Sequence, residues 1–424
     1  MTRRKKRSHR FSVLALFAAL ATIYFWQAPI VHSQTPAPQE IRGIWMTNYG
    51  ASMSYYSTRL DETIANLAKH HLNTLYPAVW NRGYTLYPSP IAEAAGGVDR
   101  DRLTSFPTIP LQDPLKGLVK QAHRQHLRMI PWFEYGLWMP TNSAIAQAHP
   151  EWLTTTISGE TTSPTGLRPR GPEPRNPLLK PLWNLKQEVV GANQGWLNPF
   201  HPEVQQFLVD LIADVVERYD VDGIQLDDHF GLPIEFGYDP YTQDLYRQEH
   251  GGAAPPSSPN NTEWVRWRAE KITQLMGRIT AAVRAADPEA IVSLSPNPPD
   301  FAYQQYLQDW QRWVASGFLD EVIVQVYRED LGALETELAQ GSLQVLSRQL
   351  PIAIGLYTGP ARRAKSADRI EQEATAVRSA GYDGISFFCW ETTLWALKGS
   401  PADRVHDLFV ELFPLDDAVA AIAP

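Results

Sequence analysis

Cysteine is almost absent from this chain of 424 residues, since Cys389 is the only one. The fold must therefore be held together by its core and not by disulfides. No motif of a nucleophilic cysteine or serine enzyme is present, and we expect Cys389 to be a small buried residue. Internal repeats, coiled-coil heptads and low-complexity segments are also missing, so the sequence predicts a single folded domain behind its N-terminal segment.

Two further absences concern cofactors. No Gly-rich phosphate loop follows the first predicted strand, which argues against a doubly wound sheet that binds nucleotides. No His-x-His or His-Glu-x-x-His cluster occurs, which argues against a zinc hydrolase. We therefore expect neither a metal ion nor another cofactor.

Positive charge is in deficit, because 38 Lys and Arg residues face 46 Asp and Glu residues. Six of the positive charges lie within the first ten residues, ahead of the uncharged residues 11–26 and the compact residues 31–33. This order is typical of a secretory signal peptide over residues 1–33. It predicts export to the periplasm, the cell envelope or beyond, with a mature chain that starts near Gln34 and a short linker over residues 34–40. The apolar segment is shorter than the ~20 residues of a membrane-spanning helix, and an uncleaved membrane anchor is the alternative.

Loss of this leader takes the formal net charge from −8 to −14, which argues against a nucleic-acid partner. Aromatic residues, by contrast, are abundant, with 14 Trp and 17 Tyr. An aromatic face beside polar groups suits a sugar, whose C–H surface stacks on the ring while its hydroxyls take hydrogen bonds. The composition therefore favours a glycan partner.

Apolar strands alternate with amphipathic helices from Ile41 onward. The predicted strands cover residues 41–47, 74–79, 128–133, 223–226, 291–295, 321–326, 352–356 and 384–388. The predicted helices cover residues 58–70, 114–126, 203–219, 262–286, 304–316, 332–348, 366–380 and 403–412. Eight such units predict a closed α/β fold, a (β/α)8 TIM barrel over residues 41–415 with a tail over 416–424, and an open doubly wound sheet is the alternative.

Three connections that follow predicted strands are unusually long, namely residues 80–113, 134–202 and 227–261. In a TIM barrel such loops lie on the catalytic face, where these insertions would build a cleft wide enough for a polymer. Within them, residues 158–180 and 251–261 are rich in turn-forming residues and are predicted to be flaps.

The most informative stretch runs over residues 219–230, where a helix leads into a short apolar strand that ends in Asp227, Asp228 and His229. Side chains just beyond the C-terminal end of a barrel strand face the active-site mouth. Adjacent carboxylates behind a buried strand are costly without a use, although an acidic cap on the next loop is the simpler interpretation.

Other predicted strand ends contribute polar and aromatic side chains to the same mouth. The candidates for substrate binding are Trp45, Asn48, Trp80, Arg82, Tyr84, Trp132, His229, Asn297, Gln325, Tyr327 and Trp390. Glu134 and Glu391 follow two further strands, so carboxyl groups from three strands would converge.

Glycoside cleavage needs two carboxyl groups, one neutral to protonate the leaving oxygen and one ionised as nucleophile or base. We expect Asp227 to be the ionised group and Asp228 to tune it, since like charges in close quarters raise one pKa. Glu391 and Glu134 compete for the role of the acid.

Several short motifs support this interpretation when they are taken together. They are Arg-Gly-Ile-Trp at 42–45, Val-Trp-Asn-Arg-Gly at 79–83, Leu-Tyr-Pro-Ser at 86–89, Leu-Asn-Pro at 197–199, His-Pro-Glu-Val at 201–204, Asp-Gly-Ile-Gln-Leu-Asp-Asp at 222–228, Gln-Val-Tyr at 325–327 and Phe-Phe-Cys-Trp-Glu at 387–391. In this order and spacing the chain resembles the glycosyl hydrolase-like 10 family of bacterial barrel proteins.

The resemblance implies a barrel, an aspartate after its fourth strand and a glycan substrate, and some members of the family act on peptidoglycan glycan strands. The chain departs from the family pattern after the third strand, where Glu134 stands in place of an Asn-Pro pair. Glu391 does match the pattern, which makes it the better candidate for the acid.

Two other classes of protein remain as alternatives. A metal-dependent hydrolase or deacetylase would use Asp227, Asp228 and His229 as ligands, since carboxylates and imidazole bind zinc and manganese. A non-catalytic glycan-binding barrel would keep the aromatic mouth and lose one of the acids.

Overall fold

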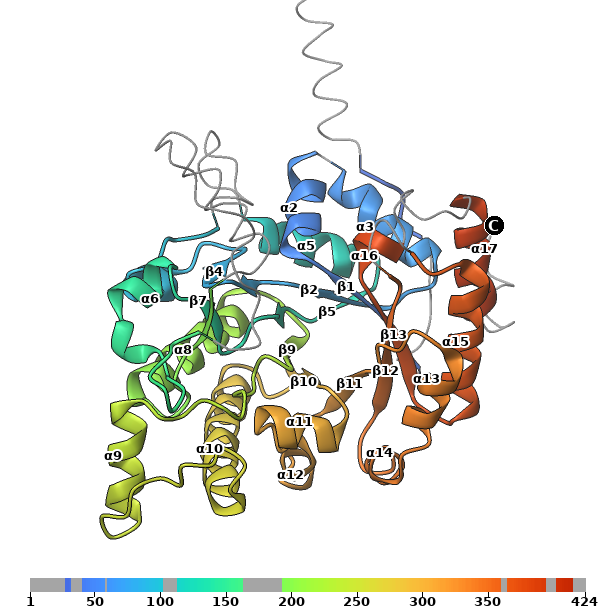
Figure 1. Ribbon diagram of the computed structural model, residues 1–424. Coiled ribbons are helices and arrows are strands. Elements are labelled where there is room, and N and C mark those ends of the chain that lie inside the picture. The colour runs from blue at the N-terminus through green and yellow to red at the C-terminus, as the bar shows by residue number, and fades with distance from the viewer. Residues whose placement is uncertain are drawn as a thin grey trace, which may run out of the picture.

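The computed structural model describes residues 27–31, 40–57, 59–101, 113–162, 193–359, 364–393 and 402–414. A parallel sheet forms its centre and helices surround it (Figure 1). The strands of this sheet are β1 (Ile41–Met46), β2 (Thr74–Pro77), β5 (Arg128–Met129), β6 (Trp132–Phe133), β9 (Gly223–Asp227), β10 (Ile291–Ser295), β11 (Glu321–Gln325), β12 (Ile352–Tyr357) and β13 (Gly384–Phe388). Their order is β5-β2-β1-β13-β12-β11-β10-β9-β6.

The two edges of this sheet, β5 and β6, are pieces of one chain segment, and this closes the barrel. β5 pairs with β2, and β6 pairs with β9. Between the two pieces, the N–H of Ile130 donates to the carbonyl of Leu75 at 3.0 Å, and the N–H of Gln225 donates to the carbonyl of Pro131 at 2.8 Å. Proline has no N–H to give to a ladder, which accounts for the interruption at Pro131. The predicted (β/α)8 TIM barrel is confirmed.

Aromatic side chains fill the inside of the barrel. Trp45 from β1 lies 5.7 Å from the ring of Tyr76 and 6.2 Å from that of Trp132, measured between ring centroids. A Cβ atom at position 355 would lie 2.9 Å from the Trp45 ring, so only Gly355 leaves room for it. These rings form a packed layer below the C-terminal ends of the strands.

Most helices lie close to their predicted bounds. They are α3 (Leu60–Lys69), α5 (Pro114–Arg124), α8 (Pro202–Arg218), α10 (Thr262–Ala286), α15 (Ala367–Ser379) and α17 (Ala402–Leu412). Among the helices that were not predicted, α2 (Asn48–Tyr56) follows β1 directly and is capped by the side chain of Thr47. Its buried residues are mostly small, so it carries little apolar periodicity.

Two predicted helices are each broken into two. Residues 304–316 form the end of α11 (Pro299–Tyr306) and all of α12 (Trp310–Ala315), because Leu307 adopts a left-handed conformation with φ of 55° and Asp309 caps a new helix. Residues 332–348 form most of α13 (Leu331–Leu338) and α14 (Gly341–Leu346). The prediction of single helices at these two places was wrong.

The long insertions contain short elements of their own. The first has β3 (Trp80–Asn81), β4 (Tyr84–Thr85) and α4 (Pro90–Ala94); the second has β7 (Trp138–Pro140), α6 (Ala144–Ala148), the 3-10 turn η1 (Pro150–Trp152) and β8 (Gln194–Trp196); the third has α9 (Pro240–Glu249). A buried polar contact joins the second and third insertions, since the Asn198 amide donates to Asp239 at 2.9 Å. Most of the predicted flap over 158–180 lies outside the described residues.

Residues 27–31 lie against the outside of the barrel. The Gln125 side chain at the end of α5 is fully buried and binds this segment twice. Its Oε1 accepts from the N–H of Val31 at 2.8 Å, and its Nε2 donates to the carbonyl of Pro29 at 3.0 Å. The N–H of Ala28 donates to Asp61 at 2.6 Å. The rest of the predicted leader and the tail over 416–424 lie outside the described residues.

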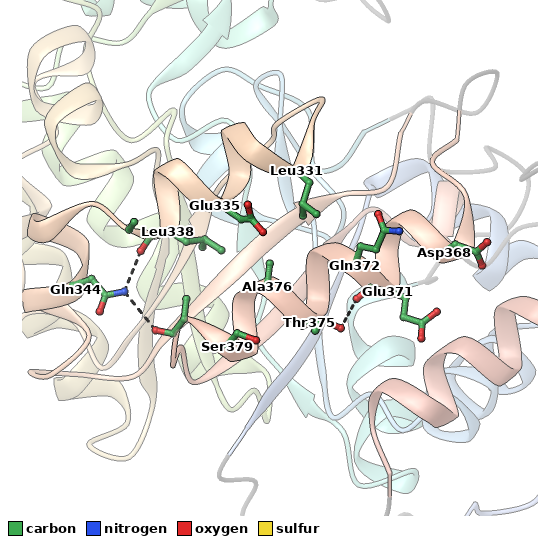
Figure 2. A pocket seen from close by; sticks show the side chains of 12 residues that line it. Leu331, Glu335, Leu338, Gln344, Asp368, Glu371, Gln372, Thr375, Ala376 and Ser379 are labelled. Carbon is green, nitrogen blue, oxygen red and sulfur yellow. Dashed lines mark hydrogen bonds between the residues drawn. The ribbon is translucent and has the colours of Figure 1, made fainter.

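No helix in the described part of the chain is long and apolar enough to cross a membrane. A cavity of about 830 Å³ lies on the outer wall between α13 and α15 (Figure 2). Helix residues line it, and none of them follows a barrel strand directly. It is therefore separate from the mouth where the predicted site residues lie.

Candidate functional site

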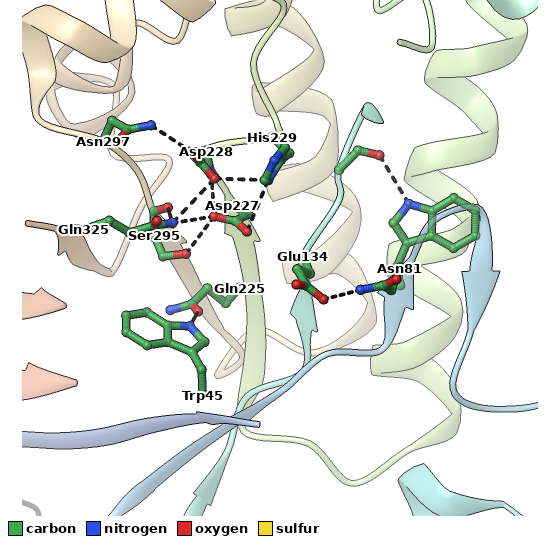
Figure 3. Close-up of polar contacts among 12 residues, drawn as sticks. Trp45, Asn81, Glu134, Gln225, Asp227, Asp228, His229, Ser295, Asn297 and Gln325 are labelled. Carbon is green, nitrogen blue, oxygen red and sulfur yellow. Dashed lines mark hydrogen bonds and ion pairs between the residues drawn. The ribbon is translucent and has the colours of Figure 1, made fainter. Parts of the chain in front are cut away.

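Asp227 is the last residue of β9 and only 2% of it is exposed. Its Oδ1 accepts three hydrogen bonds: from Nε2 of Gln325 at 2.6 Å, from its neighbour's N–H at 2.6 Å and from the Ser295 hydroxyl at 3.3 Å (Figure 3). Gln325 and Ser295 end the strands β11 and β10, so the barrel itself carries these donors. The predicted neighbourhood of Asp227 and Gln325 is present.

Asp228 and His229 extend this cluster toward the mouth. Nδ2 of Asn297 donates to Asp228 Oδ2 at 2.9 Å. The Nδ1 atom of His229 lies 3.1 Å from Asp228 Oδ1 and 3.6 Å from Asp227 Oδ2. The four residues Asp227, Asp228, His229 and Asn297 therefore form one connected group.

The electrostatics of this group separate the two carboxyl groups. Burial and the neighbouring charge of Asp228 raise the pKa of Asp227 well above its usual range. Burial opposes the charge of Asp228, but His229 and the hydrogen bonds of Asp227 and Asn297 lower the pKa of Asp228 overall. Burial alone would lower the pKa of His229, yet the two aspartates raise it well above its usual range. Asp228 and His229 thus form an ion pair beside Asp227.

Glu134 follows β6 on the strand next to β9. Phe133 pairs with Leu226 in register. Glu134 and Asp227 are the next residues along these two adjacent strands and therefore occupy corresponding positions. The Asn81 amide donates to the Glu134 carboxyl. Burial raises the pKa of Glu134 to about 7, against the opposing effect of this hydrogen bond. The protonated form of Glu134 is therefore favoured more than that of an ordinary glutamate.

Glu391 lies in α16 (Trp390–Thr393), directly after β13. Its Oε1 accepts from the Thr47 N–H at 3.0 Å and from the Thr47 hydroxyl at 2.5 Å, at the N-terminus of α2. A Cβ atom at Gly50 would lie 2.0 Å from the same oxygen, so the side chain of Glu391 fills the space that glycine leaves. The charge of Glu391 also contributes to the raised pKa of Glu134, which places both at the same end of the barrel.

Three tryptophans that were predicted to bind substrate are buried. Trp45 donates from its indole nitrogen to Gln225 at 2.7 Å inside the barrel (Figure 3). Trp80 donates to the carbonyl of Gly136 at 3.2 Å, and Trp132 belongs to the interior layer with Trp45. In this structure they support the floor of the site and present no open face to solvent.

The first insertion forms one rim of the mouth. Arg82 is buried and makes an ion pair with Asp101 at 3.3 Å, and the Asn48 amide donates to the same Asp101 oxygen at 3.3 Å. Tyr84 lies half-buried in β4. The Tyr49 ring lies 5.2 Å from the Arg82 guanidinium and is 38% exposed, an accessible aromatic residue that the sequence analysis missed.

Tyr327 and Trp390 are both half-buried. Burial and the charges of Asp227 and Asp228 raise the pKa of Tyr327 well above its usual range, so its hydroxyl keeps its proton. The Tyr327 ring packs 5.7 Å from that of Phe388. Tyr327 therefore lies near the aspartates, as predicted for a residue that follows β11.

Two further residues that hold the site were missed. The Gln308 amide is buried and donates to the main-chain carbonyl of Asp227 at 2.9 Å. The Trp310 indole donates to the carbonyl of Asn297 at 3.1 Å. Both come from the break between α11 and α12, and the left-handed Leu307 that creates it has no clear signal in the sequence.

The donor atoms of Asp227, Asp228 and His229 all lie within 4.8 Å of one another, a spacing that suits a metal ion. One observation argues against a cation at this place. The amide nitrogens of Gln325 and Asn297 point hydrogen-bond donors at carboxylate oxygens that a metal ion would need. The donor set fits a proton-transfer site better.

Several solved glycoside hydrolases share this fold. The glycoside hydrolase domain of PgaB from Bordetella bronchiseptica superposes with a TM-score of 0.55 at 14% identity, covering 87% of this chain and 99% of that one. The catalytic domain of β-amylase from Paenibacillus polymyxa gives 0.57 at 10% identity and covers 92% of this chain and 100% of the other. Likeness at such identities concerns the fold alone.

Curated relatives include the glycosyl hydrolase DigH of Escherichia coli, 24% identical over 322 residues, or 68% of this chain and 66% of DigH. The glycosyl hydrolase YngK of Bacillus subtilis is 20% identical over 325 residues, 68% of this chain and 54% of YngK. This chain thus spans slightly less than two thirds of the length of DigH and about half of the length of YngK. The family model named glycosyl hydrolase-like 10 matches residues 40–176 and 179–376, most of the barrel. The chain therefore belongs to the glycosyl hydrolase-like 10 family.

Proposed function

We propose that this protein hydrolyses glycosidic bonds with two carboxyl groups that end neighbouring strands of the barrel. The observation that carries the proposal is the pairing of Asp227 and Glu134. The first has one oxygen held by three donors, and the second has a pKa of about 7 beside it. Glycoside hydrolysis requires one ionised and one protonated carboxyl group across the scissile bond.

In this proposal Asp227 is the nucleophile or base, and it must lose its proton to act, because its surroundings raise its pKa while they lower that of Asp228. Its raised pKa makes it a stronger base than an ordinary aspartate once it has lost its proton. The ion pair of Asp228 and His229 orients Asp227 and tunes its charge, and Gln325 fixes its direction. The chemistry of this group needs no metal ion.

For the acid we propose Glu134, with Glu391 as the alternative. A general acid must carry a proton at the working pH, and a pKa of about 7 meets this condition. Glu391 matches the family pattern better in sequence, but its carboxylate oxygen serves as the acceptor for both donors of Thr47. Its other oxygen, Oε2, is buried and has no hydrogen-bond partner among the described residues, so Glu391 stays open as the alternative acid.

The substrate proposed is a glycan of the cell envelope or of the extracellular space, with the glycan strands of peptidoglycan as the specific candidate. Family membership and the predicted export of the chain support this substrate. The accessible rings around the mouth support it as well, since Tyr49 on one rim offers a stacking face.

Release of reducing ends tests the proposal. We would incubate the purified protein with peptidoglycan glycan strands freed of peptides and with aryl glycosides. Wild-type protein is expected to release reducing ends, and the Asp227→Asn variant is expected to bind glycan without releasing them. Equal activity in the two proteins would overturn the assignment.

The spacing of Asp227, Asp228 and His229 leaves a metal-dependent hydrolase or deacetylase as a second candidate. A deacetylase would release acetate and no reducing ends, so the same assay separates the two chemistries when acetate is measured in parallel.

A further inference from the structure

A cavity of about 630 Å³ opens beside the carboxylate cluster. One wall is the loop and helix that follow β10, and the other is the region where α13 meets α14. Asn297 belongs to both places, since it lines the cavity and its amide donates to Asp228 at 2.9 Å. The cavity therefore begins one side chain away from the catalytic aspartates, and its volume lies within the ~300–1,000 Å³ typical of ligand sites.

Hydrogen-bonding side chains make up most of the lining. They are Asp300, Gln304, Arg328, Glu337, Gln340 and Ser342. Pro298, Gly341 and Phe301 complete the lining, and Phe301 is 50% exposed. A polar lining with one open aromatic ring matches the two surfaces of a sugar, its hydroxyls and its C–H face.

The polar groups are held in place before any ligand arrives. The Arg328 guanidinium donates to Glu337 at 2.6 Å, and the Gln340 amide donates to the other oxygen of Glu337 at 2.5 Å. The Arg328 carbonyl accepts from Lys365 at 2.9 Å. A lining that is fixed in this way loses little entropy when it binds a ligand.

The charge of the lining selects among sugars. Glu337 neutralises Arg328, and Asp300 leaves the lining with one excess negative charge. A sugar that carries a carboxylate would meet this charge and find no free cation. The lining therefore favours a neutral sugar such as N-acetylglucosamine over an acidic one.

We propose that this cavity is a second sugar subsite, which holds a neutral unit of the glycan adjacent to the bond that is cleaved. This proposal rests on the proposed function only for the claim that the bound unit lies next to the cleaved bond. Binding of the sugar can be measured without cleavage. A subsite next to the reacting sugar contributes by positioning the scissile bond.

Binding to chito-oligosaccharides of two to six units tests the proposal. Affinities would be measured in the Asp227→Asn background, where the probe is not consumed, with hydrolysis by the wild-type chain followed in parallel. Phe301→Ala is expected to weaken binding of the six-unit probe by about ten-fold, because the stacking energy of one aromatic ring corresponds to an affinity change of about this size. Phe301→Tyr is expected to restore it.

The matched control is Tyr241→Ala, which removes another exposed aromatic ring, on α9, that does not line the cavity. Equal affinities in the Phe301→Ala and Tyr241→Ala proteins would overturn the subsite, and so would an absence of binding by any chito-oligosaccharide. Binding that depends on Phe301, together with no release of reducing ends by the wild-type chain from chito-oligosaccharides, peptidoglycan glycan strands or aryl glycosides, would uphold the subsite and remove the proposed function.

Discussion

Thr47 binds one carboxylate oxygen of Glu391 through both its main-chain N–H, at 3.0 Å, and its hydroxyl, at 2.5 Å. This contact joins the first and last strands of the barrel at the mouth. It holds Glu391 as a hydrogen-bond acceptor, whereas the pKa of Glu134 is raised to about 7. The two candidate acids therefore differ in what surrounds them, and this difference can be tested.

The identity of the acid is expected to show in the dependence on the leaving group. Glu134→Gln should slow cleavage of natural glycans by about 10²–10⁴-fold and affect aryl glycosides with good leaving groups much less, because only the former need protonation. Glu391→Gln is the matched variant. If Glu391→Gln shows this pattern and Glu134→Gln does not, Glu391 is the acid.

Asp227→Asn is expected to lower turnover by about three powers of ten while glycan binding persists. The amide keeps the shape of the side chain but removes the charge that stabilises the transition state. Turnover and binding would be measured on the same glycan strands, and circular dichroism would confirm the fold. Loss of binding in proportion to turnover would point to a structural role for Asp227.

The rate is expected to follow a bell-shaped curve against pH. Glu134 must be protonated, so activity should fall as the pH rises through about 7, and Asp227 must be ionised, so activity should fall as the pH drops through its raised pKa. Measurement of kcat/KM from pH 4 to 9 tests this. An alkaline limit that is unchanged in Glu134→Gln would contradict the assignment.

The stability of the fold is expected to depend on the protonation of Glu134. Because the pKa of Glu134 lies above its ordinary value of 4.5, its contribution to stability is full below pH 4.5 and is lost as the pH rises to about 7. The glutamine variant escapes this loss. Its melting temperature relative to the wild type should therefore be higher at pH 8 than at pH 4, and a constant difference across this range would contradict the raised pKa.

Gly50→Ala is expected to destabilise the protein, although alanine in a helix is more favourable than glycine by about 1 kcal/mol. The added Cβ would lie 2.0 Å from the Glu391 carboxylate and force it to move. In a chain that carries Glu391→Ala the clash is gone, so the same change should then be neutral or stabilising. Denaturant unfolding of the four proteins measures this coupling, and additive effects would show that the two residues do not touch.

Chelator is expected to leave activity unchanged, since the proposed mechanism uses no metal ion. The control is the addition of zinc or manganese to the treated protein. Activity that disappears with chelator and returns with the metal would assign Asp227, Asp228 and His229 as ligands instead.

The strands were predictable from the sequence because both of their faces are covered, which leaves continuous apolar runs between turn residues. The position of Asp227 at a strand end followed from these runs. Closure of the barrel depends on pairs that lie far apart in the chain on either side of Pro131, and no local pattern reports such pairs.

Local patterns also failed to separate the layers of the barrel. Trp45 and Asp227 both lie near strand ends, yet Trp45 is a level below the mouth and packs inside. A period of two residues gives the face of a strand and does not give the depth along the barrel axis. Gln308 was missed for a related reason, because helical periodicity on both sides concealed the break in which it lies.

The contact between Gln125 and residues 27–31 makes the order of folding and leader removal important. The predicted cleavage after Ser33 would take this segment away, and the Gln125 amide would then lose both main-chain partners and bind water in their place. Folding first would instead hold Val31 against the barrel, two residues from the expected cut, and hinder a peptidase that needs an extended chain. If residues 1–33 are the signal peptide that the sequence predicts, whichever event comes first would decide whether the protein is released or stays tethered by these residues.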